Sequence, residues 1–262
     1  MATPPVVLSI GAADPTAAGG IQADLKTFAA HRLYGASVVT AITTQNPHGL
    51  DDVYPVPAAV VGNQLTALLS EVPVVAVKVG MLATAEIGAV VTAKARAGLL
   101  PNLVLDPVVT TGGGNRMGVT AAVKRLLPYA TVTTPNPDEA SALLGWPVIT
   151  TADMAGAACQ LATEGAKFVV VTGGALPGEE SVDALWTPSG ARMLHEPRVG
   201  TRNASGTGCS FSAAVAAGLA LGDPPPEALT RAKKYVTWAL QGSAGWRWGR
   251  NGGAGPLNHL GF

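Results

Sequence analysis

One short segment of the chain combines the residue types that bind anions with a thiol. Gly206, Thr207, Gly208 and Cys209 lie directly before the small-residue run 210–222. Glycines at such a corner allow successive backbone N–H groups and the positive end of the following helix to point at one anion. The helix dipole is expected to lower the pKa of the Cys209 thiol, which could then act as a base or a nucleophile. The alternative is a small apolar residue packed at a helix start.

Carboxylate and amide groups follow two other apolar runs. Asp106 comes after a strand-like run and precedes Pro107, and Asn136 and Glu139 lie three apart where a helix should begin. These oxygen donors suit Mg²⁺, which proteins usually hold partly through water. Asn136 could equally cap its helix with Glu139 as the capping-box partner. Asp24 lies on the polar side of another expected helix. The sequence is equally compatible with a functional side chain and with one that only faces solvent.

Together these groups suit phosphoryl transfer. That reaction needs a metal that bridges phosphates, an anion hole for the transferred group and a base on the acceptor hydroxyl. The glycines at 112–118 lack the lysine of a P-loop, and Gly11 does not begin a G-x-G-x-x-G pattern. A P-loop enzyme and a dinucleotide-binding enzyme are therefore disfavoured.

The elements that must position these residues alternate regularly along the chain. The expected strands are 6–10, 36–43, 74–80, 102–107, 131–134 and 167–174. The expected helices are 20–31, 58–72, 85–97, 121–127, 154–163, 208–221 and 225–240, with one more beginning after 136. Two further runs, 181–187 and 191–197, predict a hairpin beside the main sheet.

This alternation predicts an α/β fold, with a parallel sheet covered by helices on both faces. No repeat, linker or charge block interrupts it, so we expect one domain over residues 1–262. Ligands bind at the carboxyl ends of strands in such sheets. The glycines and the unusual polar residues concentrate at those strand ends, which should converge on one crevice.

Composition narrows the classes of function. The 262 residues are 48% hydrophobic and 13% charged, with 17 basic and 17 acidic side chains. This balance disfavours nucleic acid or an anionic membrane as the partner. No apolar run approaches the roughly 20 residues of a membrane span, and the first residues lack signal-peptide features. We expect a cytoplasmic protein in which Cys159 and Cys209 remain thiols.

Taken in order, the motifs resemble a known family. The segments "LSIGAADPTAAGGIQADLKTF", "KVGML", "TPNPDEA", "NASGTGCSFSAAVAA" and "GPLNH" are similar to those of the hydroxymethylpyrimidine/phosphomethylpyrimidine kinases of thiamine biosynthesis. The resemblance covers essentially the full length. It implies a ribokinase-like three-layer α/β/α sandwich with a mainly parallel central sheet and a small side hairpin, assembled as a homodimer.

The resemblance also implies roles for individual residues. Gln45 would read the pyrimidine ring and its amino group, with Gly11, Met81 and Val108 lining the pocket and Asp24 near the acceptor. The corner from Gly206 to Cys209 would form the anion hole, with Cys209 near the hydroxymethyl group as the candidate base. Asn136, Thr172 and Gly174 would contact ATP, and Asp106 and Glu139 would organise Mg²⁺ around it. Two successive transfers are implied, first to the alcohol and then to the monophosphate.

Several positions depart from the family pattern. The segment 11–15 lacks a serine, Thr172 stands where a lysine is usual, 111–115 replaces a lysine-containing loop, and Ala204 and Ser205 replace the usual lead into the corner. Two lost lysines remove positive charge from the phosphate path. A pyridoxal or pyridoxine kinase of the same branch, and a catalytically weakened pyrimidine sensor, are therefore alternative functions. The three glycines at 112–114 are compatible with a loop that moves, but the sequence does not decide whether it closes over substrate.

Overall fold

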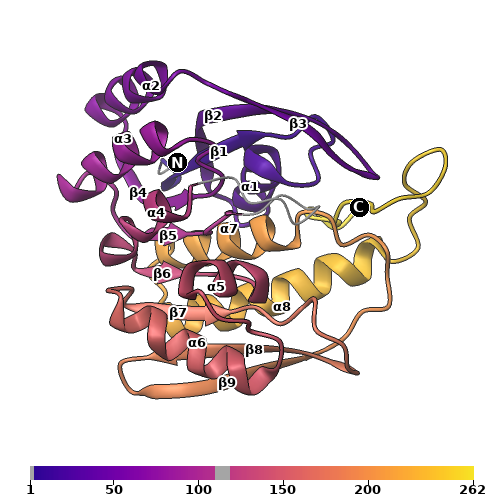
Figure 1. The fold of residues 1–262 in the computed structure, drawn as a ribbon. Helices are drawn as coiled ribbons and strands as arrows, with labels where there is room; N and C mark the ends of the chain where they lie inside the picture. The colour runs from indigo at the N-terminus through magenta and orange to yellow at the C-terminus, as the bar shows by residue number, and fades with distance from the viewer. Residues whose placement is uncertain (1–2, 110–118) are drawn as a thin grey trace.

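The computed structural model describes residues 3–109 and 119–262. Within them a sheet of nine strands crosses the molecule (Figure 1). Its parallel strands are β1 (Val6–Ala13), β2 (Tyr34–Asn46), β4 (Val74–Val79), β5 (Leu103–Leu105), β6 (Val132–Thr133) and β7 (Phe168–Val171). The antiparallel strands are β3 (Gly49–Pro55), β8 (Glu180–Thr187) and β9 (Gly190–Pro197). The order across the sheet is β3-β2-β1-β4-β5-β6-β7-β8-β9.

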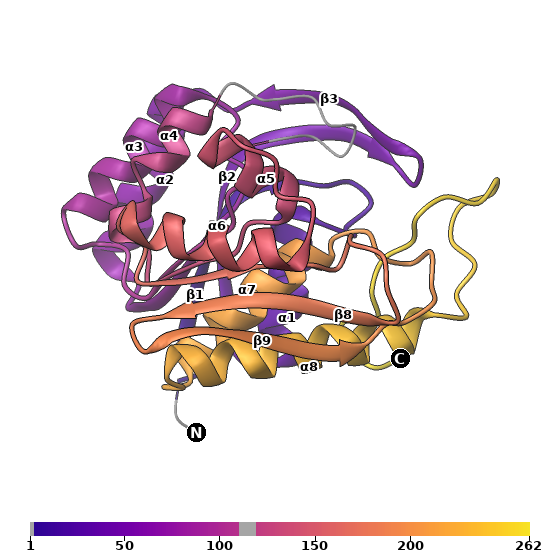
Figure 2. The same cartoon turned by 60° about the horizontal axis from the view of Figure 1, so that its bottom comes forward.

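Helices cover both faces of this sheet, which confirms the predicted three-layer sandwich (Figure 2). One face carries α2 (Ala58–Glu71), α3 (Ala85–Arg96), α4 (Thr120–Lys124), the 3₁₀ turn η1 (Leu127–Tyr129), α5 (Pro137–Leu144) and α6 (Thr151–Thr163). The other face carries α1 (Gly20–Ala30), α7 (Thr207–Ala220) and α8 (Pro225–Ser243). In the part of the chain that the structure describes, no helix is long and apolar enough to cross a membrane.

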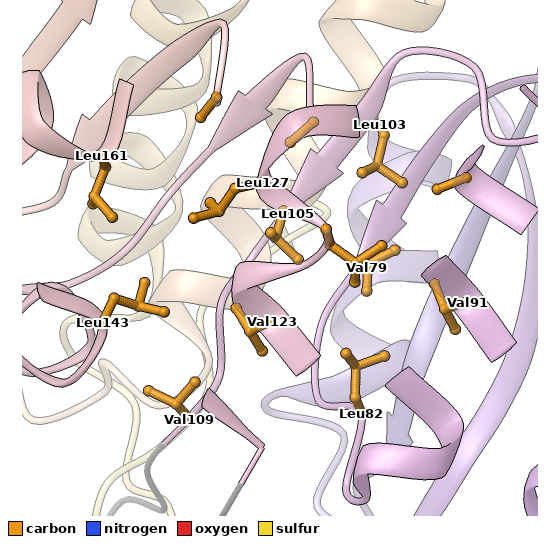
Figure 3. Packing of buried hydrophobic residues seen from close by; sticks show 14 of the residues in the cluster. Val79, Leu82, Val91, Leu103, Leu105, Val109, Val123, Leu127, Leu143 and Leu161 are labelled. Atoms are coloured by element: carbon orange, nitrogen blue, oxygen red, sulfur yellow. The ribbon is translucent and has the colours of Figure 1, made fainter. Parts of the chain in front are cut away.

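Alternate residues of each central strand feed two separate hydrophobic cores. Leu103 and Leu105 of β5 belong to the core beneath α2–α6, whereas Val104 between them belongs to the core beneath α1, α7 and α8. Figure 3 shows Leu103 and Leu105 beside Val79 and Leu127 in the first of these cores. Because both sides of a central strand are buried, it reads as a continuous apolar run. Each such leucine stabilises the fold by about 1.5–3 kcal/mol.

The sheet departs from the sequence expectations at its two edges. The predicted hairpin forms as β8 and β9, but β8 pairs with β7, so the hairpin extends the main sheet. At the opposite edge, β2 is longer than predicted and turns back into β3, a strand that the sequence did not reveal. The residues of β3 are largely exposed and include Asp51 and Asp52, so they lack the apolar alternation that marks a half-buried strand.

The strand order reverses at β1, which pairs with β2 on one side and with β4 on the other. Such a reversal opens a crevice at the carboxyl ends of the strands. Helix α7 packs against β1, β4 and β5. The fold therefore supports the first turn of α7 on the strands that bound this crevice.

Candidate active site

The corner at the start of α7 has the conformation that its glycines require. Gly206 is the N-cap of α7 with φ 79°, in the left-handed region that disfavours residues with a Cβ atom. A Cβ atom at this position would also overlap the backbone oxygen of Ala18. The corner therefore packs directly on the loop that follows β1. Since Gly206 has no side chain to cap the first turn of α7, the N–H groups there suit an anion.

Two cavities meet at this corner. The smaller, of about 370 Å³, is lined by Gly206 and Cys209, and the larger, of about 550 Å³, by Thr207 and Gly208. The smaller cavity also contains the predicted pyrimidine-binding residues Gly11, Gln45, Met81 and Val108. The larger contains the predicted ATP-binding residues Asn136, Thr172 and Gly174. The two predicted ligand sites thus lie on either side of the glycine corner, which is the arrangement that a group transfer requires.

A buried lysine, which the sequence analysis did not select, lies in the wall of the smaller cavity. Lys78 is 1% exposed, and its Nζ lies 3.1 Å from both carboxylate oxygens of Asp24 and 3.4 Å from Asp106 Oδ2. Burial by itself would lower the pKa of Lys78, but Asp24, Cys209 and Asp106 together raise it above the usual value. Lys78 therefore places a protonated ammonium group in the wall of the cavity at pH 7. Its signal in the sequence was a single lysine within the apolar run of β4.

Asp24 is not on a solvated helix face, since its exposed fraction is 0%. Its carboxylate accepts a hydrogen bond from Ser9 Oγ at 2.6 Å in addition to the contacts with Lys78. Burial raises the pKa of Asp24 despite the opposing effects of Lys78 and Ser9. Both oxygens are occupied by protein groups, and Asp24 is absent from the lining of the smaller cavity, where its partner Lys78 lies.

The predicted lowering of the Cys209 pKa is wrong. Burial raises the pKa of the thiol to about 12, and the carboxylates of Asp106 and Asp24 act in the same direction. Lys78 and the backbone N–H of Gly20 oppose this rise but do not outweigh it. Cys209 lies in the first turn of α7, where the helix dipole acts, but the loss of solvent around the thiol has the larger effect on its pKa. Cys209 is consequently a neutral thiol at pH 7.

Asp106 and Glu139 are buried neighbours. Glu139 forms the capping box with Asn136, with both backbone-to-side-chain hydrogen bonds at 2.9 Å. Asp106 accepts a hydrogen bond from Ser212 Oγ at 3.0 Å. Burial raises the pKa of Glu139 well above its ordinary value, and the charge of Asp106 raises it further. The local alternative, helix capping, is therefore confirmed for Asn136 and Glu139.

These carboxylates also fit Mg²⁺. Two buried carboxylates that repel each other are stabilised by a divalent cation between or beside them. Within residues 3–109 and 119–262 no three His, Cys, Asp or Glu side chains cluster as a metal cage. Mg²⁺ does not need such a cage, because it keeps several waters and binds one or two carboxylates together with substrate phosphates.

Asp14 is a second residue that the sequence analysis gave no role. It lines the smaller cavity with Gln45 and accepts hydrogen bonds from the backbone N–H groups of Thr16 and Gly19, each at 2.7 Å. Burial would raise the pKa of Asp14, but hydrogen bonds from Gln45, Gly19 and Thr16 lower it overall. The carboxylate is therefore ionised and holds the Gln45 amide in place.

The larger cavity has a cation in its wall although Thr172 replaces the usual lysine. Lys233 of α8 lies 2.9 Å from Asp183 Oδ2 and donates to Ser181 Oγ at 3.2 Å. The backbone N–H of Gly173 donates to the other oxygen of Asp183 at 3.0 Å. This ion pair thus fixes the turn that carries Thr172 and Gly174. The departures at 111–115 and the glycine loop at 112–118 lie outside the described residues, which end at 109 and resume at 119.

Comparison with known proteins identifies the family. A family model described as phosphomethylpyrimidine kinase matches residues 14–258. The hydroxymethylpyrimidine/phosphomethylpyrimidine kinase of Rhizobium meliloti is 42% identical over 260 residues, 97% of each chain. A thiamine biosynthesis bifunctional protein of Geobacter sulfurreducens is 40% identical over 97% of this chain, and the chain spans 52% of that relative's length.

A solved structure agrees with this result. The pyridoxal kinase of Staphylococcus aureus in complex with AMP-PCP has a TM-score of 0.90 and 35% identity, covering 100% of this chain and 95% of its own. The match extends through every element that forms the two cavities, and it confirms the ribokinase-like fold. With a family model over residues 14–258 and relatives of about 40% identity along almost its whole length, the chain belongs to the phosphomethylpyrimidine kinase family.

Proposed function

We propose that the protein transfers phosphate from ATP to 4-amino-5-hydroxymethyl-2-methylpyrimidine and then to its monophosphate, as in thiamine biosynthesis. One observation carries the proposal: the corner Gly206–Cys209 separates a cavity with the expected pyrimidine contacts from a cavity with the expected nucleotide contacts. Family membership supplies the reaction class. The names of the relatives supply the substrate.

In the smaller cavity the pyrimidine would lie against Gly11, Met81 and Val108, with its polar edge on Gln45. A planar amide donates and accepts side by side, which matches a ring nitrogen next to an amino group. The ionised Asp14 receives a hydrogen bond from Gln45. The Gln45 amide would then have its oxygen left to accept from the amino group of the pyrimidine.

In the larger cavity ATP would lie along Asn136, Thr172 and Gly174, with its terminal phosphate at Thr207 and Gly208. Asp106 and Glu139 would hold Mg²⁺ at the edge of this site. The ion would neutralise the charge on the phosphates. Lys233 lies in the same cavity wall but is paired with Asp183, so it does not restore the positive charge that the replacement of lysine by Thr172 removes.

The transfer itself depends on positioning and charge stabilisation more than on covalent chemistry. The N–H groups of the corner and the Lys78 ammonium group would stabilise the negative charge that spreads over the transferred group. Cys209 remains the candidate base, since it is the last residue of the corner and lines the smaller cavity, where the acceptor would bind. Because its thiol is neutral at pH 7, it must ionise first, which Lys78 favours electrostatically.

A substrate panel tests this function. Purified protein with ATP and Mg²⁺ is offered hydroxymethylpyrimidine, its phosphate, pyridoxal and pyridoxine, and ADP release is measured for each. We expect turnover with both pyrimidines. Pyridoxal is the second candidate because the similar solved structures include pyridoxal kinases. Preferred turnover of pyridoxal would reassign the substrate, and pyrimidine binding without turnover would identify a sensor.

Assembly, location and domain organisation are also part of the proposal. We infer that residues 1–262 act as one kinase domain, supported by the single continuous sheet. We expect a homodimer, with Ile42 and Tyr54 as the contact face, because they pair across β2 and β3 and are 58% and 57% exposed. Sedimentation of wild type and Ile42→Glu tests this.

We also expect residence in the cytoplasm, consistent with the free thiols of Cys159 and Cys209. Fractionation of cells would check this expectation.

A further inference from the structure

A buried histidine near the C-terminus takes no part in the transfer described above. His259 is 3% exposed, and its Nε2 lies 2.8 Å from Ser210 Oγ. Ser210 directly follows Cys209 in the first turn of α7, and its Oγ is also 2.9 Å from the backbone oxygen of Gly206. A side chain 49 positions away in the sequence therefore contacts the turn that separates the two cavities.

The segment 255–259 holds this turn from both sides. The backbone N–H of Ser205, just before the corner, donates to the oxygen of Gly255 at 3.0 Å. Just after the corner, Ser210 contacts His259. The corner is thus attached to the C-terminal segment through the residues on either side of it, in addition to its packing on the loop after β1.

The C-terminal segment is itself fixed to α8. The backbone N–H of Asn258 donates to the oxygen of Ala239 at 3.1 Å, and the Tyr235 hydroxyl donates to the oxygen of His259 at 3.0 Å. Both partners lie within α8, which packs along α7. His259 therefore has a rigid support and can transmit the position of α8 to the corner.

The state of the ring suits this role. Burial, with a further contribution from the charge of Lys26, lowers the pKa of His259 to about 4. The ring also has a hydrogen bond with the backbone of Leu257. A neutral imidazole that donates through one nitrogen accepts through the other. Nε2 therefore shares a hydrogen bond with Ser210 Oγ, which also contacts the backbone oxygen of Gly206.

We propose that His259 is a positioning residue of the kinase, which through Ser210 holds the phosphate-binding corner Gly206–Cys209 in its productive geometry. Catalytic donors must be held within fractions of an ångström of the transferring group to stabilise it. The effect on turnover rests on the proposed function. The effect on the rigidity of the corner does not.

Three variants test the contact, and a fourth serves as a control. His259→Phe keeps a ring but removes the ring nitrogen that contacts Ser210, Ser210→Ala removes the hydroxyl, and His259→Gln places an amide group near the position of Nε2. The control is Thr150→Ala, which removes the cap that accepts from Asp153 N–H at 3.1 Å at the exposed start of α6. It lowers stability without touching the corner. Ser210→Ala is small enough to keep the protein folded if His259→Phe is not.

Two readouts are measured on the full-length protein. Hydrogen exchange of the peptide containing 205–210 should be faster by about tenfold or more in His259→Phe and Ser210→Ala, and close to wild type in His259→Gln and Thr150→Ala. With both substrates, kcat should fall about tenfold in the first two variants while each KM changes less than about threefold. The double variant Ser210→Ala/His259→Phe should be no worse than either single one.

Unchanged exchange of the corner in Ser210→Ala would overturn the proposal. So would losses of kcat that multiply in the double variant, because independent defects multiply. A wild-type protein without kinase activity would contradict the proposed function instead, and the exchange data would still decide whether His259 positions the corner.

Discussion

Lys78 Nζ lies 3.1 Å from both oxygens of Asp24 and 3.4 Å from Asp106 Oδ2, so one buried ammonium group joins helix α1 to the end of strand β5. The arrangement places one cation between two carboxylates beneath the smaller cavity. Hydrogen bonds hold both carboxylates in position, because Ser9 donates to Asp24 and Ser212 donates to Asp106. The charge at the centre of the site is thereby fixed before any ligand binds.

Removing this cation should destabilise the protein and abolish most turnover. Lys78→Met leaves Asp24 buried without a counter-charge, which costs about 3–5 kcal/mol in the free energy of unfolding. Lys78→Met/Asp24→Asn removes both charges and should recover most of that loss, as urea unfolding would show. Turnover should remain at least about 10²-fold below wild type in the double variant, because the cation stabilises the transferred group. A double variant with wild-type turnover would exclude Lys78 from catalysis.

Two glycines of the corner should respond differently to alanine. Gly206→Ala places a Cβ atom on the backbone oxygen of Ala18 and requires an unfavourable positive φ, so we expect poor folding or a melting temperature lower by several degrees. At Gly208 a Cβ atom meets nothing within 4 Å. Gly208→Ala should therefore keep or slightly raise stability, since alanine favours helix by about 1 kcal/mol.

The Gly208→Ala variant should nevertheless bind ATP less tightly, because its methyl group projects from a residue that lines the larger cavity. Calorimetry with a non-hydrolysable ATP analogue measures this effect. Gly245→Ala, also open around its Cβ position and absent from the lining of both cavities, is the matched control. Equal affinities of the two variants would mean that nucleotide phosphate does not approach Gly208.

The reactivity of Cys209 should follow its raised pKa. In a Cys159→Ser background, alkylation of Cys209 by iodoacetamide should be slow at pH 7 and rise about tenfold per pH unit toward pH 10, because only the thiolate reacts. If Cys209 is the base, kcat rises over the same range, and Cys209→Ala lowers kcat on the order of 10²-fold and removes the rise. A wild-type kcat that is independent of pH would remove Cys209 from proton transfer and leave the corner as the main stabiliser.

The glycine corner, the strand ends and the motif order were predictable from the sequence, because each depends on local chemistry or on a pattern read along the chain. Lys78 was not predictable in the same way, since its partner Asp24 is 54 positions away. The Cys209 pKa was mispredicted for a related reason. The dipole of its own helix is visible in the sequence, whereas the burial that raises the pKa comes from several separate elements.

The edge of the sheet gives a second example. Strand β3 forms because β2 continues past its predicted end and offers an unpaired edge. Its own residues carry no apolar alternation, so only the tertiary partner determines that they are a strand. The two cavities were likewise predictable as sets of contact residues through family resemblance, but their meeting at Gly206–Cys209 required the fold.

Acid should destabilise the protein through His259. In the unfolded chain this histidine binds a proton near pH 6.5, whereas in the folded protein the pKa is about 4. Between these values the unfolded state takes up more protons, so stability is full above about pH 6.5 and falls as the pH drops toward about 4. The shift corresponds to a loss in the free energy of unfolding on the order of 3 kcal/mol.

Because carboxylates also titrate in this range, the measurement compares urea unfolding of wild type and His259→Gln at pH 7.5, 6, 5 and 4. The difference between the two proteins should shrink or reverse as the pH falls, and parallel curves would show that His259 is not neutral in the folded protein.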